Sequence, residues 1–226
     1  MSRGALYVVG TRSFAAEVVE YATAAGFAVA GLLEPYDRER VGTEVHGLPV
    51  AWLEDAGPVV AAVGTGERDR RPVVERLAAA GIEPVAVVHP AAHVSASASV
   101  GEGCVIGPAA VVGAASELGR HVVVGRGALV GHHVVVGDFA TLNPGANVGG
   151  NTTIGSGALV AIGAVVRDHV RIGSSALVAA GAVVVGDVTD GIEVRGLPAR
   201  PVERSEASDG TRNDAQRAQP EPRQRA

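Results

Sequence analysis

The chain has 226 residues, and its 24 acidic residues outnumber its 19 basic ones to give a formal net charge of −5. This balance argues against a general surface for nucleic acid or for an anionic membrane. No apolar stretch is long enough to span a bilayer, and the first one, residues 5–9, is too short for the core of a signal peptide. We therefore expect a cytoplasmic protein without membrane insertion, with room for one repeat structure and one further small domain.

Residues 1–88 carry the pattern of an alternating α/β domain. Apolar runs predict strands, and apolar residues at helical spacing predict helices between them. The expected strands are residues 5–9, 28–33, 59–63 and 85–88, and the expected helices are residues 14–25 and 71–80. Such alternation indicates a small parallel sheet that binds ligands at the carboxyl ends of its strands.

The turn after the first strand, Gly10-Thr11-Arg12-Ser13-Phe14, leads directly into the first helix. Backbone N–H groups at such a turn attract phosphate. The turn lacks the G-x-G-x-x-G spacing of a dinucleotide site, which argues against nicotinamide chemistry. From these residues alone, a plain strand-to-helix turn and a nucleotide pocket are equally good interpretations.

From residue 94 to residue 189 the sequence repeats every six residues. The lead position of each hexad is aliphatic and branched, the next is usually Gly, and the fifth is small or Val. The lead residues are Val94, Val100, Ile106, Val112, Leu118, Val124, Val130, Val136, Leu142, Val148, Ile154, Val160, Val166, Ile172, Val178 and Val184. This pattern is typical of a parallel β-helix, in which three hexads form one coil and residues eighteen apart stack about 4.8 Å from each other. Amphipathic helices would instead need a period of about 3.6 residues and few glycines.

We assign residues 89–193 to this β-helix, with His89-Pro90 at the crossing from the α/β domain. Residues 194–202 are expected to form a capping segment. Residues 203–226 are polar and charged with almost no apolar side chain, so we expect a disordered tail, to which we assign no function. Cys104 occupies a fifth position, where small residues point inward, which predicts a buried structural thiol and no nucleophile.

Two adjacent histidines provide the best candidate for chemistry. His132 and His133 hold the third and fourth positions of the hexad that Val130 opens, where side chains point away from the core. Gly150 follows His132 by one coil, so a bare backbone amide is expected about one strand spacing, roughly 4.8 Å, from the imidazole. An imidazole that accepts a proton beside an N–H that stabilises an oxyanion suits acyl transfer from a thioester. A solvated surface histidine is the alternative.

Several motifs together resemble a known family. They are Gly131-His132, Val136-Gly137-Asp138-Phe139-Ala140, Pro144-Gly145-Ala146, Gly149-Gly150, Ile154-Gly155 and Gly196-Leu197-Pro198-Ala199-Arg200. In these residues the chain closely resembles the hexapeptide-repeat sugar acetyltransferases. It is most similar to the group that contains the sialic-acid O-acetyltransferases and the UDP-N-acetylbacillosamine N-acetyltransferases.

This resemblance implies a Rossmann-like domain that binds a nucleotide sugar, joined to a left-handed parallel β-helix and assembled as a homotrimer with active sites between neighbouring copies. It implies acetyl-CoA as the co-substrate, no metal, no nucleic-acid partner, His132 as the general base and Gly150 as the oxyanion amide. The residues that it places near acetyl-CoA are Thr141, Ile162 and Ala180. The residues that it places at the nucleotide sugar are Arg12, Ser13, Phe14, Glu34 and Gly64.

The chain departs from this family where His133 follows the catalytic histidine, because the family usually has Glu or Asp there. A neutral His133 could accept a hydrogen bond from His132 in place of the carboxylate. We therefore predict acetyl transfer to an amino or hydroxyl group of an activated sugar. The alternatives are a scaffold protein that has lost catalysis and, less favoured, a carbonic-anhydrase-like metal hydrolase that uses His133 and His169, for which a third imidazole is missing.

Overall fold

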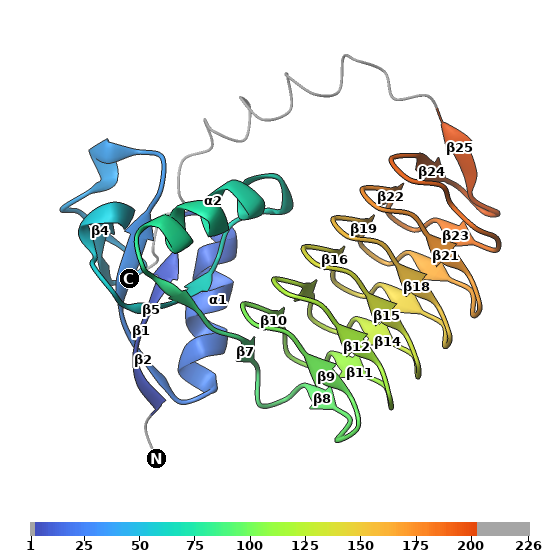
Figure 1. The fold of residues 1–226 in the computed structure, drawn as a ribbon, viewed down its shortest axis with the longest axis horizontal. Helices are drawn as coiled ribbons and strands as arrows, with labels where there is room; N and C mark the ends of the chain where they lie inside the picture. Colours follow the sequence, from blue (N-terminus) through green and yellow to red (C-terminus); the bar gives the residue numbers. More distant parts are fainter. Residues whose placement is uncertain (1–2, 203–226) are drawn as a thin grey trace, which may run out of the picture.

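The computed structural model describes residues 3–202, so the predicted disordered tail lies outside the described residues. Figure 1 shows an α/β domain that stands beside a stack of regular triangular coils. The predicted combination of an α/β domain with a parallel β-helix is confirmed. None of the helices among the described residues is long and apolar enough to cross a membrane.

The α/β domain is built on one sheet with the strand order β3-β4-β2-β1-β5-β6. Its strands are β1 (Arg3–Val9), β2 (Phe27–Glu34), β3 (Glu44–Val45), β4 (Leu48–Trp52), β5 (Val60–Val63) and β6 (Glu83–Pro84). Its helices are α1 (Ser13–Ala24), α2 (Glu67–Ala79) and the short 3-10 turns η1 (Arg38–Arg40) and η2 (Leu53–Asp55). All neighbours in this sheet are parallel except β3 and β4, which form an antiparallel hairpin. The β3–β4 hairpin was not predicted, because its strands are too short to show a period.

One predicted strand belongs to a different sheet. The sequence predicts that residues 85–88 complete the α/β sheet, but β7 (Val87–Val88) pairs with β10 (Val105–Ile106) of the β-helix, where Val87 lies beside Val105. The edge of the α/β sheet is taken by β6 instead. Val88 lies six residues before the first lead residue, so the hexad repeat begins one hexad earlier than its most regular part suggested.

The β-helix has three faces, each a sheet of parallel two-residue strands, except that face 1 ends in two three-residue strands that pair antiparallel. Face 1 consists of β7, β10 (Val105–Ile106), β13 (Val123–Val124), β16 (Thr141–Leu142), β19 (Leu159–Val160), β22 (Leu177–Val178), β24 (Glu193–Arg195) and the antiparallel β25 (Arg200–Val202). Face 2 consists of β8 (His93–Val94), β11 (Val111–Val112), β14 (Leu129–Val130), β17 (Asn147–Val148), β20 (Val165–Val166) and β23 (Val183–Val184). Face 3 consists of β9 (Ser99–Val100), β12 (Glu117–Leu118), β15 (Val135–Val136), β18 (Thr153–Ile154) and β21 (Arg171–Ile172).

The predicted stacking of residues eighteen apart is confirmed by the strand register. Leu129 pairs with Asn147 and Val130 with Val148, and the same offset recurs from β10 to β23. From Ile106 onward the lead residues are buried, as are the small fifth-position residues, so both sets fill one continuous core. Cys104 is fully buried in this core, and burial raises the pKa of its thiol to about 11. The thiol is therefore structural, as predicted, because it carries almost no thiolate at neutral pH.

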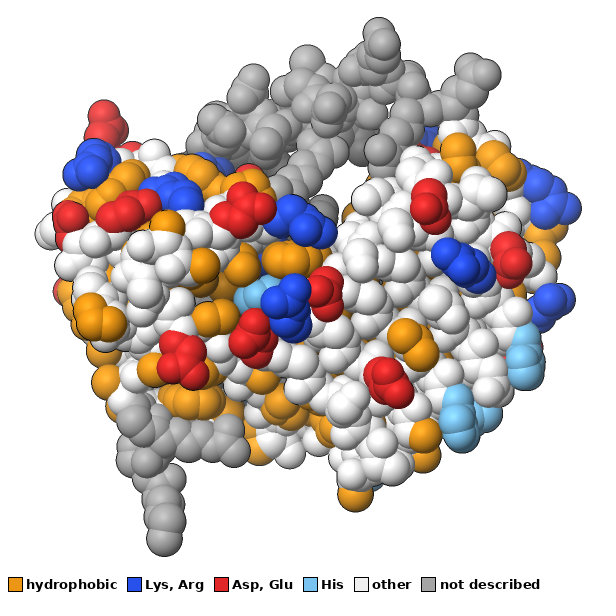
Figure 2. Space-filling view, viewed as in Figure 1, with side chains coloured by type: hydrophobic (Ala, Val, Ile, Leu, Met, Phe, Trp, Pro, Cys, Tyr) orange, Lys and Arg blue, Asp and Glu red, His pale blue; other side chains and the backbone are white. Residues whose placement is uncertain are grey.

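The α/β domain packs against the N-terminal coils of face 1. Val105 and Val123 belong to the same apolar cluster as the helix α1 residue Val18. Across the domain junction, Arg126 Nη1 lies 3.0 Å from both carboxylate oxygens of Glu17, and Arg70 Nη2 donates to the carbonyl oxygen of Phe139 at 3.0 Å. On the side shown in Figure 2, acidic and basic side chains are interspersed, which leaves that side without a large field of one sign.

His121 is buried at a corner of the β-helix near this junction. Its ring stacks on that of Phe139, with the centroids 4.9 Å apart, and only 2% of the residue is exposed. Burial lowers the pKa of His121 below its usual value. The folded protein therefore resists protonation of this ring.

We expect His121→Phe to reduce the loss of stability in acid. The unfolded chain binds a proton at this residue below about pH 6.5 whereas the folded chain does not, so the free energy of unfolding falls as the pH drops below that value. Phe139 shows that a phenyl ring fits this corner conformation. Thermal unfolding at pH 7.5 and 5.5 measures the effect, and an equal drop for both proteins would contradict the argument.

Candidate active site

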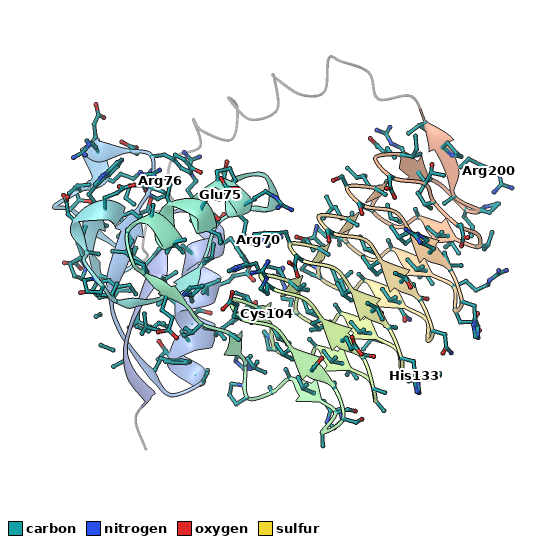
Figure 3. All side chains as sticks on the ribbon, viewed as in Figure 1. Arg70, Glu75, Arg76, Cys104, His133 and Arg200 are labelled. Carbon is teal, nitrogen blue, oxygen red and sulfur yellow. The ribbon has the colours of Figure 1, made fainter. Side chains whose placement is uncertain are left out.

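His132 and His133 lie at the corner between face 2 and face 3, after β14 and before β15. Both side chains are exposed, and Figure 3 shows His133 at the edge of the β-helix that points away from the α/β domain. Their Nδ1 atoms are 3.1 Å apart, and the two rings are nearly perpendicular, at 85°. A hydrogen bond between two imidazole nitrogens requires one donor and one acceptor, so only one of the two Nδ1 atoms carries the proton that they share.

Gly150 lies directly over the ring of His132, as the spacing of eighteen residues predicts. A Cβ atom on Gly150 would lie 2.7 Å from Nε2 of His132 and 2.8 Å from its Cε1. Only glycine therefore allows the imidazole to occupy this position. The carbonyl oxygen of Gly150 accepts a hydrogen bond from the His169 N–H at 3.0 Å.

The N–H of Gly150 makes no hydrogen bond to any other part of residues 3–202. At two equivalent positions of the described coils the N–H is capped by an aspartate from the next coil: the N–H of Arg120 donates to Oδ1 of Asp138 at 2.8 Å, and that of Ser174 to Oδ1 of Asp190 at 2.9 Å. Asp168 holds the equivalent place above Gly150, but its Oδ2 atom lies 3.9 Å from Nε2 of His169. The corner thus combines an imidazole that can accept a proton with an open backbone donor, which is the arrangement that acyl transfer requires.

The three residues expected near acetyl-CoA lie elsewhere in the same chain. Ile162 and Ala180 are exposed at the corner between face 1 and face 2, and the Gly181 N–H donates to the Ile162 carbonyl, so they form the expected column. Thr141 is buried on face 1, where its Oγ1 accepts a hydrogen bond of 2.5 Å from Nη2 of Arg70. Figure 3 shows Arg70 between the two domains. Thr141 therefore contributes to the packing of the domains.

The residues expected at the nucleotide sugar meet at one edge of the α/β sheet. Val9, Leu33 and Val63 are neighbours in the register, so the segments that follow β1, β2 and β5 come together. Arg12 and Ser13 are exposed at the start of α1. These two residues are therefore available to a ligand.

The other three expected residues have internal contacts. Phe14 packs against the apolar cluster of the domain. Gly64 allows α1 to approach β5, because a Cβ atom there would lie 2.8 Å from the Cα of Ala15. Glu34 is 5% exposed, and its carboxylate accepts hydrogen bonds from the Thr11 hydroxyl and from two backbone N–H groups.

Sequence reasoning missed Arg40, whose guanidinium lies over the loop between β1 and α1. Its Nη1 atom is 3.4 Å from the carbonyl oxygen of Thr11. The two residues are 29 positions apart, and an arginine within a polar segment carries no pattern that would reveal such a contact.

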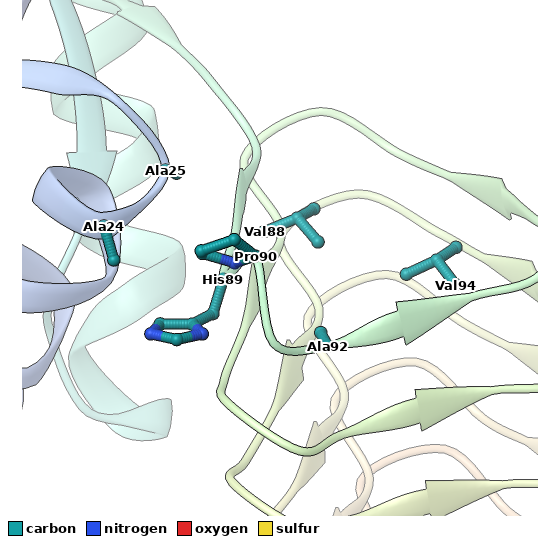
Figure 4. Close-up of a pocket in the computed structure, with 7 residues that line it drawn as sticks. All are labelled: Ala24, Ala25, Val88, His89, Pro90, Ala92 and Val94. Carbon is teal, nitrogen blue, oxygen red and sulfur yellow. The ribbon is translucent and has the colours of Figure 1, made fainter.

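An open pocket of about 400 Å³ lies between the end of α1 and the first coil, and none of these residues lines it. Figure 4 shows its lining, which consists of Ala24, Ala25, Val88, His89, Pro90, Ala92 and Val94. Among the side chains that the structure describes, no group of three or more His, Cys, Asp or Glu residues could hold a metal ion. The His132 corner is the candidate active site because it places two hydrogen-bonded imidazoles beside the open N–H of Gly150.

Comparison with protein-family models gives no match, and comparison with curated protein sequences gives none either. Solved structures do match. The acetyltransferase domain of PglB from Neisseria gonorrhoeae FA1090 is 36% identical, with a TM-score of 0.81 over 88% of this chain and 99% of that one. The chain belongs to the hexapeptide-repeat sugar N-acetyltransferases. The family resemblance inferred from the sequence motifs is thereby confirmed, and the protein is an acyltransferase.

Two further structures of this family hold ligands. The PglB domain has also been solved in complex with acetyl coenzyme A, at 36% identity, a TM-score of 0.81 and coverage of 88% of this chain and 98% of that one. A point mutant of perosamine N-acetyltransferase from Caulobacter crescentus, in complex with CoA and GDP-perosamine, is 28% identical. It matches with a TM-score of 0.83 over 88% of this chain and 97% of that one.

We expect Gly150→Ala to lower kcat while the protein stays folded. The new Cβ would displace the His132 imidazole, and a shift of about 1 Å at a reacting group costs roughly a hundredfold in rate. Gly186→Ala is the matched control, since a Cβ there meets nothing within 4 Å. Steady-state assays of both variants test the expectation, which fails if Gly150→Ala turns over at the rate of the control.

Proposed function

We propose that this N-acetyltransferase moves the acetyl group of acetyl-CoA to the amino group of a nucleotide-activated amino sugar, with His132 as the general base. The observation that carries the proposal is the imidazole of His132, paired with His133 and placed under the unoccupied N–H of Gly150. An amino acceptor is favoured over a hydroxyl because the perosamine enzyme among the similar structures is an N-acetyltransferase.

The His132–His133 pair sets the tautomer that the reaction needs. When Nδ1–H of His132 donates to Nδ1 of His133, the lone pair of His132 lies on Nε2, which is the ring atom nearest to a Cβ placed on Gly150. If His133 donated instead, His132 would carry its proton on Nε2 and could not accept another there. His133 is therefore a positioning residue, which takes the place of the carboxylate that is common in the family.

The reaction then runs by direct transfer. The amino nitrogen attacks the thioester carbon and forms the C–N bond, while Nε2 of His132 removes a proton from that nitrogen. The Gly150 N–H stabilises the negative oxygen of the tetrahedral intermediate. The C–S bond breaks as the carbonyl re-forms, and His132 returns the proton to the departing thiolate of CoA. No acyl-enzyme is formed, and no side chain is consumed.

The two candidate ligand regions of the β-helix lie at different corners of the same chain. The His132 corner and the column of Ile162 and Ala180 border face 2 on its two sides. Face 2 carries exposed apolar side chains between them, among which Leu129 is 42% and Val165 is 38% exposed. A second copy packed along face 2 would cover these side chains and bring the column of one copy to the histidine pair of the other.

This argument supports a homotrimer in which each active site is shared by two copies. The proposal also includes a left-handed β-helix, as is usual in the family. It includes a cytoplasmic location as well, because acetyl-CoA and nucleotide sugars are both available there.

Replacement of His132 by Asn should lower kcat at least about a hundredfold, the lower end of what a general base contributes. The assay measures free thiol released from acetyl-CoA with UDP-, GDP- and dTDP-linked 4-amino sugars and with free sialic acids as acceptors. His169→Asn is the control, because His169 is an exposed histidine two coils after His133 in the same column. Binding of CoA without thiol release from any acceptor would favour the scaffold alternative.

The same assay separates the two histidines. His133→Ala is expected to fold, because Ala115 has the same left-handed conformation one coil earlier in the same column. It should lower kcat about tenfold or more through loss of the Nδ1 acceptor, with an unchanged KM for acetyl-CoA. His133→Asp restores an acceptor and should recover most of the rate. If Ala and Asp give the same kcat, His133 does not position His132.

Leu129→Asp should yield a monomer with little activity, because a carboxylate cannot be buried against an apolar neighbour without a partner. Light scattering coupled to size-exclusion chromatography measures the mass, and the thiol assay measures the rate. Val135→Asp on face 3 is the matched control, since Val135 is 45% exposed. A Leu129→Asp variant with the mass of three chains would contradict the proposed interface.

A further inference from the structure

Arg70 of α2 is a buried cation that crosses the junction between the two domains (Figure 3). Only 2% of the residue is exposed, and its Nη2 atom donates to the carbonyl oxygen of Phe139 and to Oγ1 of Thr141. Burial of a guanidinium is costly unless its N–H groups are accepted. A shift of the α/β domain along the β-helix would therefore weaken two charge-assisted hydrogen bonds.

Phe139 makes a second contact with α2 at the same corner. The guanidinium carbon of Arg71 lies 4.3 Å from the centroid of its ring, a favourable arrangement of a cation and an aromatic face. The corner itself is held within the β-helix. The Phe139 N–H donates to the carbonyl oxygen of Arg120 at 2.8 Å, and the ring stacks on that of His121, with the centroids 4.9 Å apart. Arg70 and Arg71 thus contact a well-supported part of the coil.

The corner that these arginines contact belongs to the coil that carries the histidine pair. The strands β14, β15 and β16 lie on faces 2, 3 and 1 in turn, so they form one complete coil. His132 lies between β14 and β15, Phe139 lies between β15 and β16, and Thr141 is the first residue of β16. Through Arg70, the α/β domain is therefore bonded to the coil of the proposed general base.

The other contacts of the junction define the position along the axis of the β-helix less sharply. Val105 and Val123 lie on β10 and β13, the two strands before β16 on face 1, and they join the apolar cluster of the α/β domain. Apolar packing has little directional preference. Arg126 and Glu17 form an ion pair with side chains that are 56% and 40% exposed, and exposed pairs contribute little. The hydrogen bonds of Arg70 have the narrowest limits of distance and angle.

The position along this axis matters because the proposed reaction brings together two ligands that different domains hold. The acceptor belongs to the α/β domain and acetyl-CoA to the β-helix. The reacting atoms must come within about 3.5 Å, and a displacement of about 1 Å costs roughly a hundredfold in rate. One coil spans about 4.8 Å, so a shift by a fraction of a coil slows the reaction strongly. Where copies pack along face 2 with their axes parallel, equivalent coils lie at one level, so the constraint also holds for a site shared by two copies.

We propose that Arg70 and Thr141 are positioning residues for the acetyl transfer, which set the level of the acceptor-binding domain relative to the coil of His132. This inference rests on the proposed function for the reaction and for the places of the two ligands. Neither residue touches a substrate. Thr141 acts on the rate through the junction of the domains, in place of the contact with acetyl-CoA that the family resemblance implies.

Kinetics separate positioning from binding. Arg70→Lys keeps the charge but cannot present the same planar donors, and it should lower kcat at least about tenfold, which corresponds to a displacement of about 0.5 Å. Thr141→Val keeps the shape and removes one acceptor, and it should lower kcat about threefold or more. Thr141→Ser keeps the hydroxyl and should retain most of the rate. The Kd values of CoA and of the nucleoside diphosphate that the wild type binds, measured by titration calorimetry, should stay unchanged in all three variants.

Spin labels measure the position of the domain without any substrate. Glu75→Cys on α2 and Arg171→Cys on face 3 place one label on each domain, and both residues are exposed. Cys104 stays unlabelled, because it is fully buried. In assemblies with one labelled copy, double electron-electron resonance should give one narrow distance for the wild-type background and a broader or shifted distribution after Thr141→Val. Arg126→Gln removes only the exposed ion pair of the junction, so it is the matched control and should change neither the distance nor kcat.

Several results would overturn the inference. They are a lower kcat in Thr141→Val and Arg70→Lys without a changed distance distribution, a changed distribution without a lower kcat, and a loss of ligand affinity that accounts for the lower rate. A lower melting temperature as the only change would do the same. If the wild type acetylates no amino sugar, the proposed function fails, and the distance distributions alone decide whether Arg70 and Thr141 fix the position of the domain.

Discussion

The spacing between coils determines which residues of the β-helix lie in contact, both in its core and at the candidate active site. Because neighbouring parallel strands lie about 4.8 Å apart, each residue of the β-helix lies at about that distance from the residue eighteen positions later in the chain. A glycine in one coil, which has no side chain, therefore leaves room for a ring in an adjacent coil. Gly150 and His132 use this rule, and so do Gly103 and His121, where a Cβ on the glycine would overlap the imidazole. The His132 ring is exposed and the His121 ring is buried, so the same arrangement serves the proposed chemistry at one corner and packing at another.

The α/β domain limits where that chemistry can occur. By packing on the early coils of face 1 it buries Val105, Val123 and Thr141, while face 2 and the corners at its two edges stay uncovered. The contacts that fix this position are a mixture of apolar packing and of hydrogen bonds from Arg70, together with the ion pair of Glu17 and Arg126. These contacts join the α/β domain to the β-helix along face 1, which leaves face 2 open to the neighbouring copy that we propose.

The β-helix could be predicted from the sequence because its rule is local and repeated. A branched residue at each lead position and small residues at the corners fit only a period of six residues. Because a coil contains eighteen residues, the sequence numbers alone predict that Gly150 lies over His132. The α/β domain was harder. The β3–β4 hairpin has no period, and Val87–Val88 has the composition of a sheet strand in either domain. The position of Thr141 under Arg70 and the internal bonds of Glu34 depend on contacts between segments far apart in the chain. No local sequence pattern predicts such contacts.

The corners of the coils hold residues other than glycine in the left-handed region, among them Ala109, Ala115 and Ser175. Each of these costs roughly 1–2 kcal/mol that an asparagine or a glycine would largely avoid. These three corners lie outside the histidine pair and the ligand edge of the α/β domain. Replacement of these residues by glycine or asparagine would remove most of this cost and so raise the melting temperature. None of the three replacements would change a residue that we place in the reaction.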